Sequence, residues 1–266
     1  MASKKFNNVY IKDNFSIVGP LEREGLLKNY DFVMDDYYYG EKTFEQAEIK
    51  MQKTVLEALL NQNKLSDSKV DAIIGGDLIN QISISSYMAS LFRIPYLGVY
   101  SACASYIEAL IIASSFISGK LAKNIACVTN SHNLNAERQF RYPIEYGAIK
   151  KHTTTFTATA AVATLLTSEP TGIKIESATI GKAVDMGIKD VNNMGAVMAP
   201  AAVDVLNTHL VEMKRNINYY DMVLTGDLGL VGREIFTEML DKVHNIRIKK
   251  YMDAGGEIYT NTQETY

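Results

Sequence analysis

The chain has 266 residues and a formal net charge of −3, and 47% of its residues are hydrophobic. This length allows one large domain or two closely packed halves around a sizeable core. The acidic balance gives no reason to expect a nucleic-acid partner, because nucleic-acid phosphates attract basic surfaces.

Helical and strand patterns alternate along the chain after an N-terminal part, residues 1–43, in which we expect no regular structure. The expected helices cover residues 44–62, 82–92, 103–118, 200–214 and 232–243. The expected strands cover residues 72–76, 95–100, 124–130, 154–167, 173–181, 222–225 and 246–250. We expect loops over the long polar segment 131–153 and in the C-terminal tail. This alternation predicts an α/β fold with helices on both faces of a sheet.

The sequence shows no sign of a metal site or a membrane span. The two cysteines, Cys103 and Cys127, and the four histidines lack the spacing of a zinc site, so we expect no metal and no cofactor. The N-terminal sequence MASKKFNNVYIKDNF has no apolar core of a signal peptide. The most apolar expected helix, 103–118, contains Glu108 and several serines, so we expect no transmembrane helix.

An internal duplication is the strongest constraint on the fold. Residues 51–78 align without a gap to residues 201–228, at an offset of 150. Each copy reads as an amphipathic helix, a polar turn, a short apolar strand and then Gly-Asp-Leu. The matching pairs are Val55/Val205, Leu56/Leu206, Leu60/Leu210, Lys64/Lys214, Asp71/Asp221, Gly76/Gly226, Asp77/Asp227 and Leu78/Leu228. The duplication predicts two related α/β halves.

Cys103 lies at the start of a helix that is apolar nearly all round, so we expect this helix inside the protein, between layers. Backbone N–H groups and the helix dipole favour an anion there, and they would lower the pKa of a thiol. Cys103 is therefore a candidate nucleophile. The alternative is that Cys103 is a small buried thiol used in packing. Cys127, in the middle of an apolar strand, is expected to be core.

The duplication and a cysteine at the head of a buried helix together resemble the thiolase-like superfamily. Five stretches carry a closer resemblance: GGDLINQ (75–81), SACASYIEAL (101–110), SHNLNAERQFRYPIEYG (131–147), MGAVMAPAAVD (194–204) and TGDLGLVG (225–232). They are similar to the stage V sporulation protein AD family, over about residues 16 to 262. The resemblance implies a layered αβαβα arrangement of duplicated α/β halves. The first half would cover 1–190, with a polar insertion at 131–153, and an incomplete second half would cover 191–266.

The resemblance also implies a function. It implies a non-enzymatic subunit of the SpoVA machinery that binds dipicolinic acid, in free form or as its calcium chelate, during uptake into the developing spore. The partners would be membrane-embedded SpoVA subunits and a second copy of the chain, on the cytoplasmic side of the spore inner membrane. One alternative is an acyltransferase of the thiolase or ketoacyl-synthase type using Cys103. Another is a scaffold in which dimerisation matters and the ligand site is vestigial.

The candidate ligand residues all lie in the first half. Asp77 ends a strand, where open α/β sheets place ligand groups, and Cys103 marks a helix N-terminus. A helix N-terminus could hold one carboxylate of dipicolinate, and an arginine fork could hold the other. The candidates in or after the strand 124–130 are Asn130, Ser131, His132, Asn133, Arg138 and Arg141.

Structural roles remain open for these candidates. Asp77 recurs as Asp227, so it could be a cap of the strand–helix turn, and His132 could bond a loop carbonyl. Arg138 and Arg141 could pair with Glu137 and Glu145 and so pin the polar segment or line a dimer surface. A condensing enzyme also needs groups that stabilise an oxyanion, which the superfamily takes largely from its second half. After residue 228 the chain offers only His244, so we expect no complete condensing site.

Overall fold

The fold is that of a computed structural model, which describes residues 2–140, 153–260 and 263. A mixed seven-stranded sheet forms the centre of the first half, in the order β3-β2-β7-β6-β4-β5, with β8 paired to β2. Its strands are β2 (Tyr10–Val18), β3 (Phe32–Val33), β4 (Ala72–Gly76), β5 (Tyr96–Gly98), β6 (Asn124–Ser131), β7 (Ala160–Thr167) and β8 (Ile173–Lys174). Strands β4, β5 and β6 are parallel, and β7 is antiparallel to both of its neighbours. A separate antiparallel pair joins β1 (Ser3–Lys5) to β9 (Ser177–Thr179).

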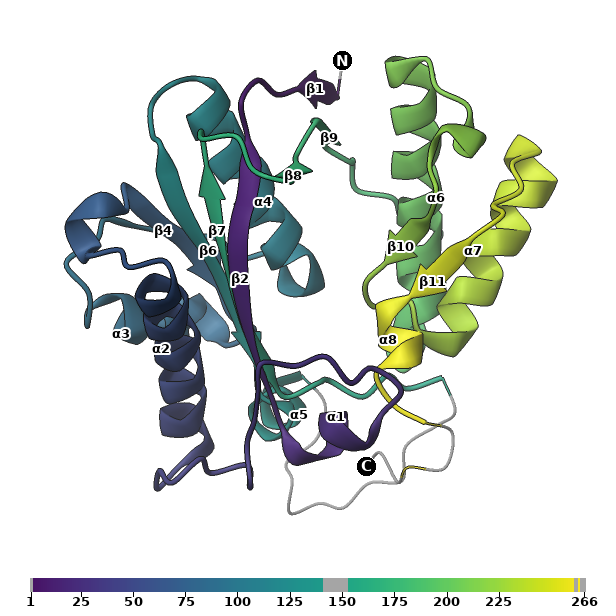
Figure 1. The fold of residues 1–266 in the computed structure, drawn as a ribbon. Coiled ribbons are helices and arrows are strands. Elements are labelled where there is room, and N and C mark those ends of the chain that lie inside the picture. Colours follow the sequence, from purple (N-terminus) through teal and green to yellow (C-terminus); the bar gives the residue numbers. More distant parts are fainter. Residues whose placement is uncertain (1, 141–152, 261–262, 264–266) are drawn as a thin grey trace.

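Helices cover both faces of this sheet (Figure 1). The helices α2 (Phe44–Gln62) and α3 (Ser83–Ala89) lie on one face, around a core that includes Met51, Leu56 and Ile73. Helix α4 (Ser105–Ser118) lies on the other face, over a second core that contains Ile74 and Cys127. Two short helices, α1 (Pro20–Glu24) and α5 (Asn133–Phe140), lie beyond one end of the sheet. The alternation of Ile73 and Ile74 between the two cores follows the two-residue period of a strand.

The second half has its own small core. Helices α6 (Met194–Met213) and α7 (Gly229–His244) pack against the parallel pair β10 (Val223–Thr225) and β11 (Tyr251–Asp253), and α8 (Ala254–Glu257) comes directly after β11. A Cβ on Gly195 would lie 2.7 Å from the backbone nitrogen of Gly232, so the two helices need glycine where they cross. Figure 1 shows α2 and α3 on one side of the large sheet and α4 on the other, with the second-half elements α6, α7, β10 and β11 beyond α4. The expected layered α/β fold is confirmed.

The duplicated sequences adopt the same local structure. In each copy a long helix (α2 or α6) leads through a 3₁₀ turn, Asp67–Lys69 or Ile217–Tyr219, into a short strand, β4 or β10. The two strands differ in their neighbours, because β4 pairs with strands on both sides, whereas β10 pairs with β11 alone among the described strands.

Several sequence-based expectations were wrong. Residues 1–43 contain β2, a full member of the sheet, in which apolar and polar residues alternate only from Phe15 to Ile17. The polar segment 131–153 contains α5. The strand expected at 246–250 lies at Tyr251–Asp253, because Val223 to Thr225 pair with those residues.

Helix α4 is less enclosed than its composition predicts. Ile107 is 55% exposed, and Leu110, Ile111 and Ile112 are partly exposed, because no described element fully covers that side of the helix. Helix α6, which we did not consider as a membrane span, is the one described helix long and apolar enough to cross a membrane by length and composition. A helix that packs in a protein core passes the same test, and Ala199 and Val203 of α6 belong to the second-half core.

Polar contacts join the two halves at two places. At one end, the His209 ring on α6 bonds Thr179 Oγ1 of the first half through Nδ1 (2.7 Å), while its Nε2 bonds the Tyr220 hydroxyl within the second half (2.5 Å). At the other end, the Tyr259 hydroxyl donates to the carboxylate of Glu22, which is fully buried on α1.

Candidate functional site

The parallel strands β4, β5 and β6 end at one edge of the sheet, and a candidate residue lies after each of them. Asp77 comes directly after β4, Cys103 lies five residues after β5, and His132 comes directly after β6. This edge is where open α/β sheets place their ligands. The three residues lie on different faces, because Asp77 and His132 point toward the side of α2 and α3, whereas Cys103 leads into α4.

Asp77 is a buried capping residue. Its Oδ1 accepts the N–H of Ile79 (2.8 Å), and its Oδ2 accepts the N–H of Ser85 in the first turn of α3 (2.7 Å). Burial raises the pKa of its carboxyl, and the bonds from Ser85 and Ile79 oppose this rise. The turn that it closes is strained, because Gln81 and Ile82 both have left-handed backbones. The structural alternative, a cap of this turn in both halves, is confirmed for Asp77 but not for Asp227, and a ligand role for Asp77 stays a prediction.

Cys103 lies in an exposed 3₁₀ turn, Ala102–Ala104, that leads into α4. The packing alternative for this thiol is therefore wrong, whereas Cys127 is buried in the core as expected. Ala102, just before Cys103, has a left-handed backbone with φ of 46°. No side chain caps the start of α4. Strained backbone beside an exposed thiol at an uncapped helix start marks this turn as the strongest ligand candidate of the described chain.

A buried polar cluster that sequence reasoning missed lies behind Asp77. Glu48, on α2, is fully buried, and its two carboxyl oxygens accept from Asn130 Nδ2 (3.0 Å) and Asn135 Nδ2 (2.6 Å). Burial and the nearby Asp77 raise the pKa of Glu48 to about 8. A glutamate among the apolar residues of the α2 core face was the available signal. Asn130 is thus bound to α2 and does not face an open site.

His132 is buried between aromatic rings. Its Nε2 lies 2.8 Å from the Tyr37 carbonyl oxygen, so Nε2 carries the proton. Its ring stacks on Phe44 at 5.2 Å between centroids. Burial lowers the pKa of His132, which favours the neutral imidazole. The alternative in which His132 bonds a loop carbonyl is confirmed.

The other candidates after β6 also have partners within the chain. Asn133 Nδ2 donates to the Thr157 carbonyl oxygen (2.9 Å), and Ser131 Oγ donates to that of Ala158 (2.7 Å). Arg138 forms an exposed ion pair with Glu45 (2.9 Å), so it pins α5 to α2, and the expected partner Glu145 lies outside the described residues. Arg141 lies outside the described residues. Ligand roles for Asn133, Arg138 and Arg141 stay predictions.

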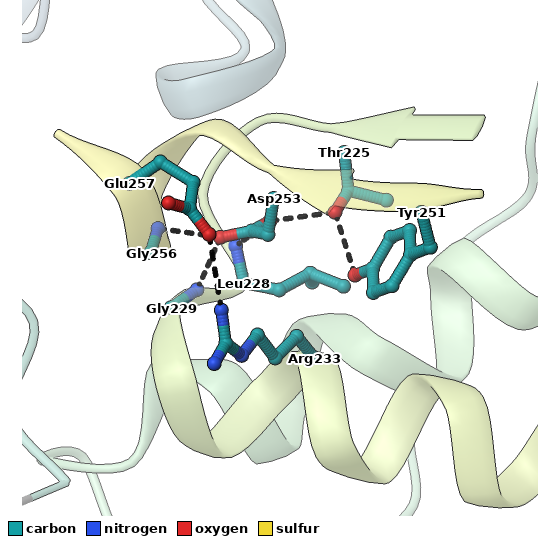
Figure 2. Close-up of polar contacts among 8 residues, drawn as sticks. All are labelled: Thr225, Leu228, Gly229, Arg233, Tyr251, Asp253, Gly256 and Glu257. Atoms are coloured by element: carbon teal, nitrogen blue, oxygen red, sulfur yellow. Dashed lines mark hydrogen bonds and ion pairs between the residues drawn. The ribbon is translucent and has the colours of Figure 1, made fainter. Parts of the chain in front are cut away.

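The second half repeats the capping arrangement with a different residue (Figure 2). Asp253, at the end of β11, is fully buried, and it accepts the N–H groups of Leu228 and Gly229 at the start of α7 (3.1 and 2.9 Å). The Thr225 hydroxyl also donates to Asp253 (2.6 Å). Asp227, the sequence counterpart of Asp77, is exposed. The start of α7 is thus filled by a carboxylate of the chain itself.

Other polar contacts complete this second network. The Tyr251 hydroxyl donates to Thr225, Gly256 N–H donates to Asp253, and Arg233 pairs with Glu257, as Figure 2 shows. Across the described ranges, no three His, Cys, Asp or Glu side chains come together as metal ligands.

Comparisons with known proteins agree with this geometry. The family model for stage V sporulation protein AD matches residues 2–266. The chain is 36% identical over 259 residues to stage V sporulation protein AD of Bacillus subtilis (strain 168), covering 97% of this chain and 77% of that protein.

Solved structures show the same fold at low identity. A variant of Xanthomonas campestris OleA bound with cerulenin has a TM-score of 0.64 at 13% identity, over 95% of this chain and 84% of that chain. The 3-oxoacyl-[acyl-carrier-protein] synthase III of Aquifex aeolicus VF5 has a TM-score of 0.59 at 15% identity, over 97% and 87%. An OleA variant with bound lauric acid and lauroyl-CoA has a TM-score of 0.60 at 13% identity, over 95% and 86%. With this thiolase-like fold and the family match along its length, the chain belongs to the stage V sporulation protein AD family.

Proposed function

We propose that this chain is a non-enzymatic dipicolinic-acid-binding subunit of the SpoVA machinery that moves dipicolinate into the developing spore. The observation that carries the proposal is the family match along residues 2–266. The ligand would bind as the free dianion or as its calcium chelate. The geometry at the start of α4 supports a site for such an anion.

No side chain caps the start of α4, whereas carboxylates of the chain cap two comparable helix starts, and Glu108 is the one acidic residue in the first turn of α4. Asp77 accepts an N–H in the first turn of α3, and Asp253 accepts the N–H groups at the start of α7. The turn 101–104 before α4 is exposed, and no side chain caps the helix. Helix starts attract anions because their N–H groups point outward. One carboxylate of dipicolinate would lie there, beside Cys103.

Buried polar residues on the other face of the sheet fix the strand ends near this proposed site. Asp77 and Glu48 hold the strand ends and α5 in place through their hydrogen bonds to Ser85 and Asn135. Arg138 is occupied by Glu45, so Arg141 is the sequence candidate left for the second carboxylate. Fixed surroundings favour binding because little ordering is needed when the ligand arrives.

The competing proposal is acyl transfer by Cys103. It is favoured by the fold shared with a synthase and with an OleA variant that holds lauroyl-CoA. Acyl transfer needs an imidazole or an amide near the thiol to stabilise the oxyanion. Among the described histidines, His132 lies on the α2 face and bonds a carbonyl, and both ring nitrogens of His209 have partners. These engaged histidines favour binding over catalysis.

A second copy of the chain is part of the proposal. Strand β5 is the edge of the large sheet, and edge strands invite pairing with another chain. Large apolar side chains on β5 and on the flanking segments are exposed: Tyr87, Leu91, Leu97, Tyr100 and Ile107. A homodimer across β5 would cover them. Membrane-embedded SpoVA subunits would hold the dimer at the cytoplasmic side of the spore inner membrane.

The test is a calorimetric titration of the purified protein with dipicolinate, with benzene-1,3-dicarboxylate as the matched ligand that lacks the ring nitrogen. We expect saturable binding of dipicolinate, at least tenfold weaker in Cys103→Glu, because the added carboxylate competes for the helix start. A parallel incubation with an acyl-CoA should give no mass increase on Cys103. Absence of dipicolinate binding, or a stoichiometric Cys103 adduct, would overturn the proposal. A stable dimer that neither binds dipicolinate nor forms a Cys103 adduct would favour the scaffold alternative.

A further inference from the structure

The polar cluster around Glu48 contains more hydrogen-bond acceptors than donors. Both carboxyl oxygens of Glu48 accept from neutral amides, on Asn130 and Asn135. Three further buried oxygens have no donor: Gln52 Oε1, Asn130 Oδ1 and Asn135 Oδ1. Gln52 lies one helical turn from Glu48, on the same side of α2. Buried polar atoms nearly always have partners, so a cluster whose unpaired atoms are all acceptors lacks a proton or a cation.

The charges around Glu48 oppose its ionisation. Asp77, whose carboxyl is 1% exposed, and Glu45, one turn earlier on α2, both raise the pKa of Glu48 electrostatically. The basic side chain of α5, Arg138, is turned to Glu45 in an exposed ion pair. A buried carboxylate without a cation is costly, and such a group takes up a proton instead.

Within the part of the chain that the structure describes, the remaining titratable groups on the surrounding elements supply no positive charge. His132, at the end of β6, is buried with a lowered pKa. Glu137, on α5, is another buried acid. Tyr96, on β5, donates its hydroxyl to the Gly75 carbonyl oxygen (3.1 Å).

We propose that Glu48 is protonated at neutral pH and acts as a proton switch that holds α5 against α2. The protonated carboxyl supplies the missing donor. A 180° flip of the side-chain amide of either asparagine exchanges its oxygen and nitrogen, which have nearly the same size. The amide oxygen then accepts a hydrogen bond from the Glu48 O–H. When Glu48 loses its proton, a second buried negative charge forms near Asp77. Asn135 then holds α5 to a carboxylate in an unfavourable site, so the contact between α5 and α2 weakens and α5 opens more often.

Two other contacts would keep α5 attached when Glu48 ionises. The Gln139 amide donates to the Leu78 carbonyl oxygen (3.0 Å) and accepts the N–H of Asn80 (3.0 Å). The ion pair of Arg138 and Glu45 is the other contact. We therefore expect local opening of residues 133–140 and not global unfolding. This switch does not depend on dipicolinate binding.

The direct test is a carboxyl ¹³C NMR titration of the full chain with labelled glutamate. The Glu48 resonance should titrate near pH 8, and it should be absent in Glu48→Gln. Titration near the ordinary glutamate pKa, about 4.3, would overturn the proposal. Stoichiometric calcium retained after dialysis and lost only with a chelator would also overturn it, because a cation would then satisfy the acceptors.

Hydrogen exchange tests the consequence for α5. After correction for the intrinsic exchange rate, amides 133–140 should exchange at least tenfold faster at pH 9 than at pH 7. Glu48→Gln, which mimics the protonated acid, should abolish this change, whereas Glu57→Gln, at an exposed position of α2 that pairs with Lys53, should retain it. Equal pH dependence in wild type and Glu48→Gln would contradict the switch. If Glu48→Gln does not fold, the wild-type NMR titration still decides.

Discussion

Lys64 and Lys214, which lie 150 residues apart, both have a left-handed backbone, with φ of 53° and 55°. Each residue ends the long helix of its copy. The N–H of the next residue donates to the carbonyl oxygen of Leu60 in one copy and of Leu210 in the other, at 2.9 Å in both. The internal duplication therefore extends to the hydrogen bond that closes the helix.

Glycine should be tolerated at these two helix ends. Lys64→Gly or Lys214→Gly should leave the free energy of unfolding unchanged or higher, because glycine adopts this backbone without steric cost. Lys64→Val should lower the free energy of unfolding by about 1–2 kcal/mol. Urea unfolding measures both. The matched control is Lys53→Gly, inside α2, which should cost about 1 kcal/mol. An equal loss in Lys64→Gly and Lys53→Gly would contradict the left-handed assignment.

No side chain fits at Gly195 or Gly232, where α6 and α7 cross. Gly195→Ala or Gly232→Ala should lower the free energy of unfolding by about 1–3 kcal/mol, because the new Cβ meets backbone atoms within 3.0 Å. Gly172 has nothing within 4 Å of its Cβ position, so Gly172→Ala is the control. In thermal melts, the melting temperature should fall in the two variants at the helix crossing and stay close to that of wild type in the control. Three equal melting temperatures would disprove the close crossing.

Asp77 and Asp227 are counterparts in the duplication, but their replacement by alanine should change the free energy of unfolding by different amounts. Asp77→Ala removes the acceptor of two backbone N–H groups and should cost about 1–3 kcal/mol in the free energy of unfolding. Asp227→Ala should change it by less than about 0.5 kcal/mol, because Asp227 is exposed and Asp253 caps α7 in its place. Comparable losses in the two variants would show that both aspartates cap their helices.

Acid should weaken the contact between the two halves at His209. Burial lowers the pKa of His209, so the fold favours the neutral ring. Stability from this group is present above the ordinary histidine pKa, about 6.5, and is lost as the pH falls below it. Between pH 7 and pH 5 the urea midpoint of wild type should fall more than that of His209→Gln. His244→Gln, at the end of α7, should behave as wild type. An equal fall of the urea midpoint between pH 7 and pH 5 in wild type and His209→Gln would refute this role.

Much of the fold was readable from apolar periodicity. The expected helix 44–62 and strand 72–76 coincide with α2 and β4, because both bury regular apolar positions. Helix α5 was missed because its buried residues include Asn133 and Asn135, which hydrogen bonds satisfy instead of apolar contacts. A polar pattern of this kind resembles a loop until its partners on other elements are known.

The candidate site was only partly readable. The strand ends identified Asp77 and His132 as buried and polar, but their partners, Ser85 and the Tyr37 carbonyl, come from separate segments. Glu48 lies 29 residues before Asp77, and only the packing of α2 on the sheet brings the two carboxyls near each other. Spacing along a sequence does not encode such contacts.

Protection of Cys103 from alkylation tests the central claim most directly, that dipicolinate binds at the start of α4. Cys103 is exposed and should react with iodoacetamide in the folded protein, whereas buried Cys127 is the internal control that reacts only after unfolding. Saturating dipicolinate should slow the modification of Cys103 at least tenfold, and benzene-1,3-dicarboxylate should slow it less. An unchanged rate of Cys103 modification at saturating dipicolinate would contradict the account.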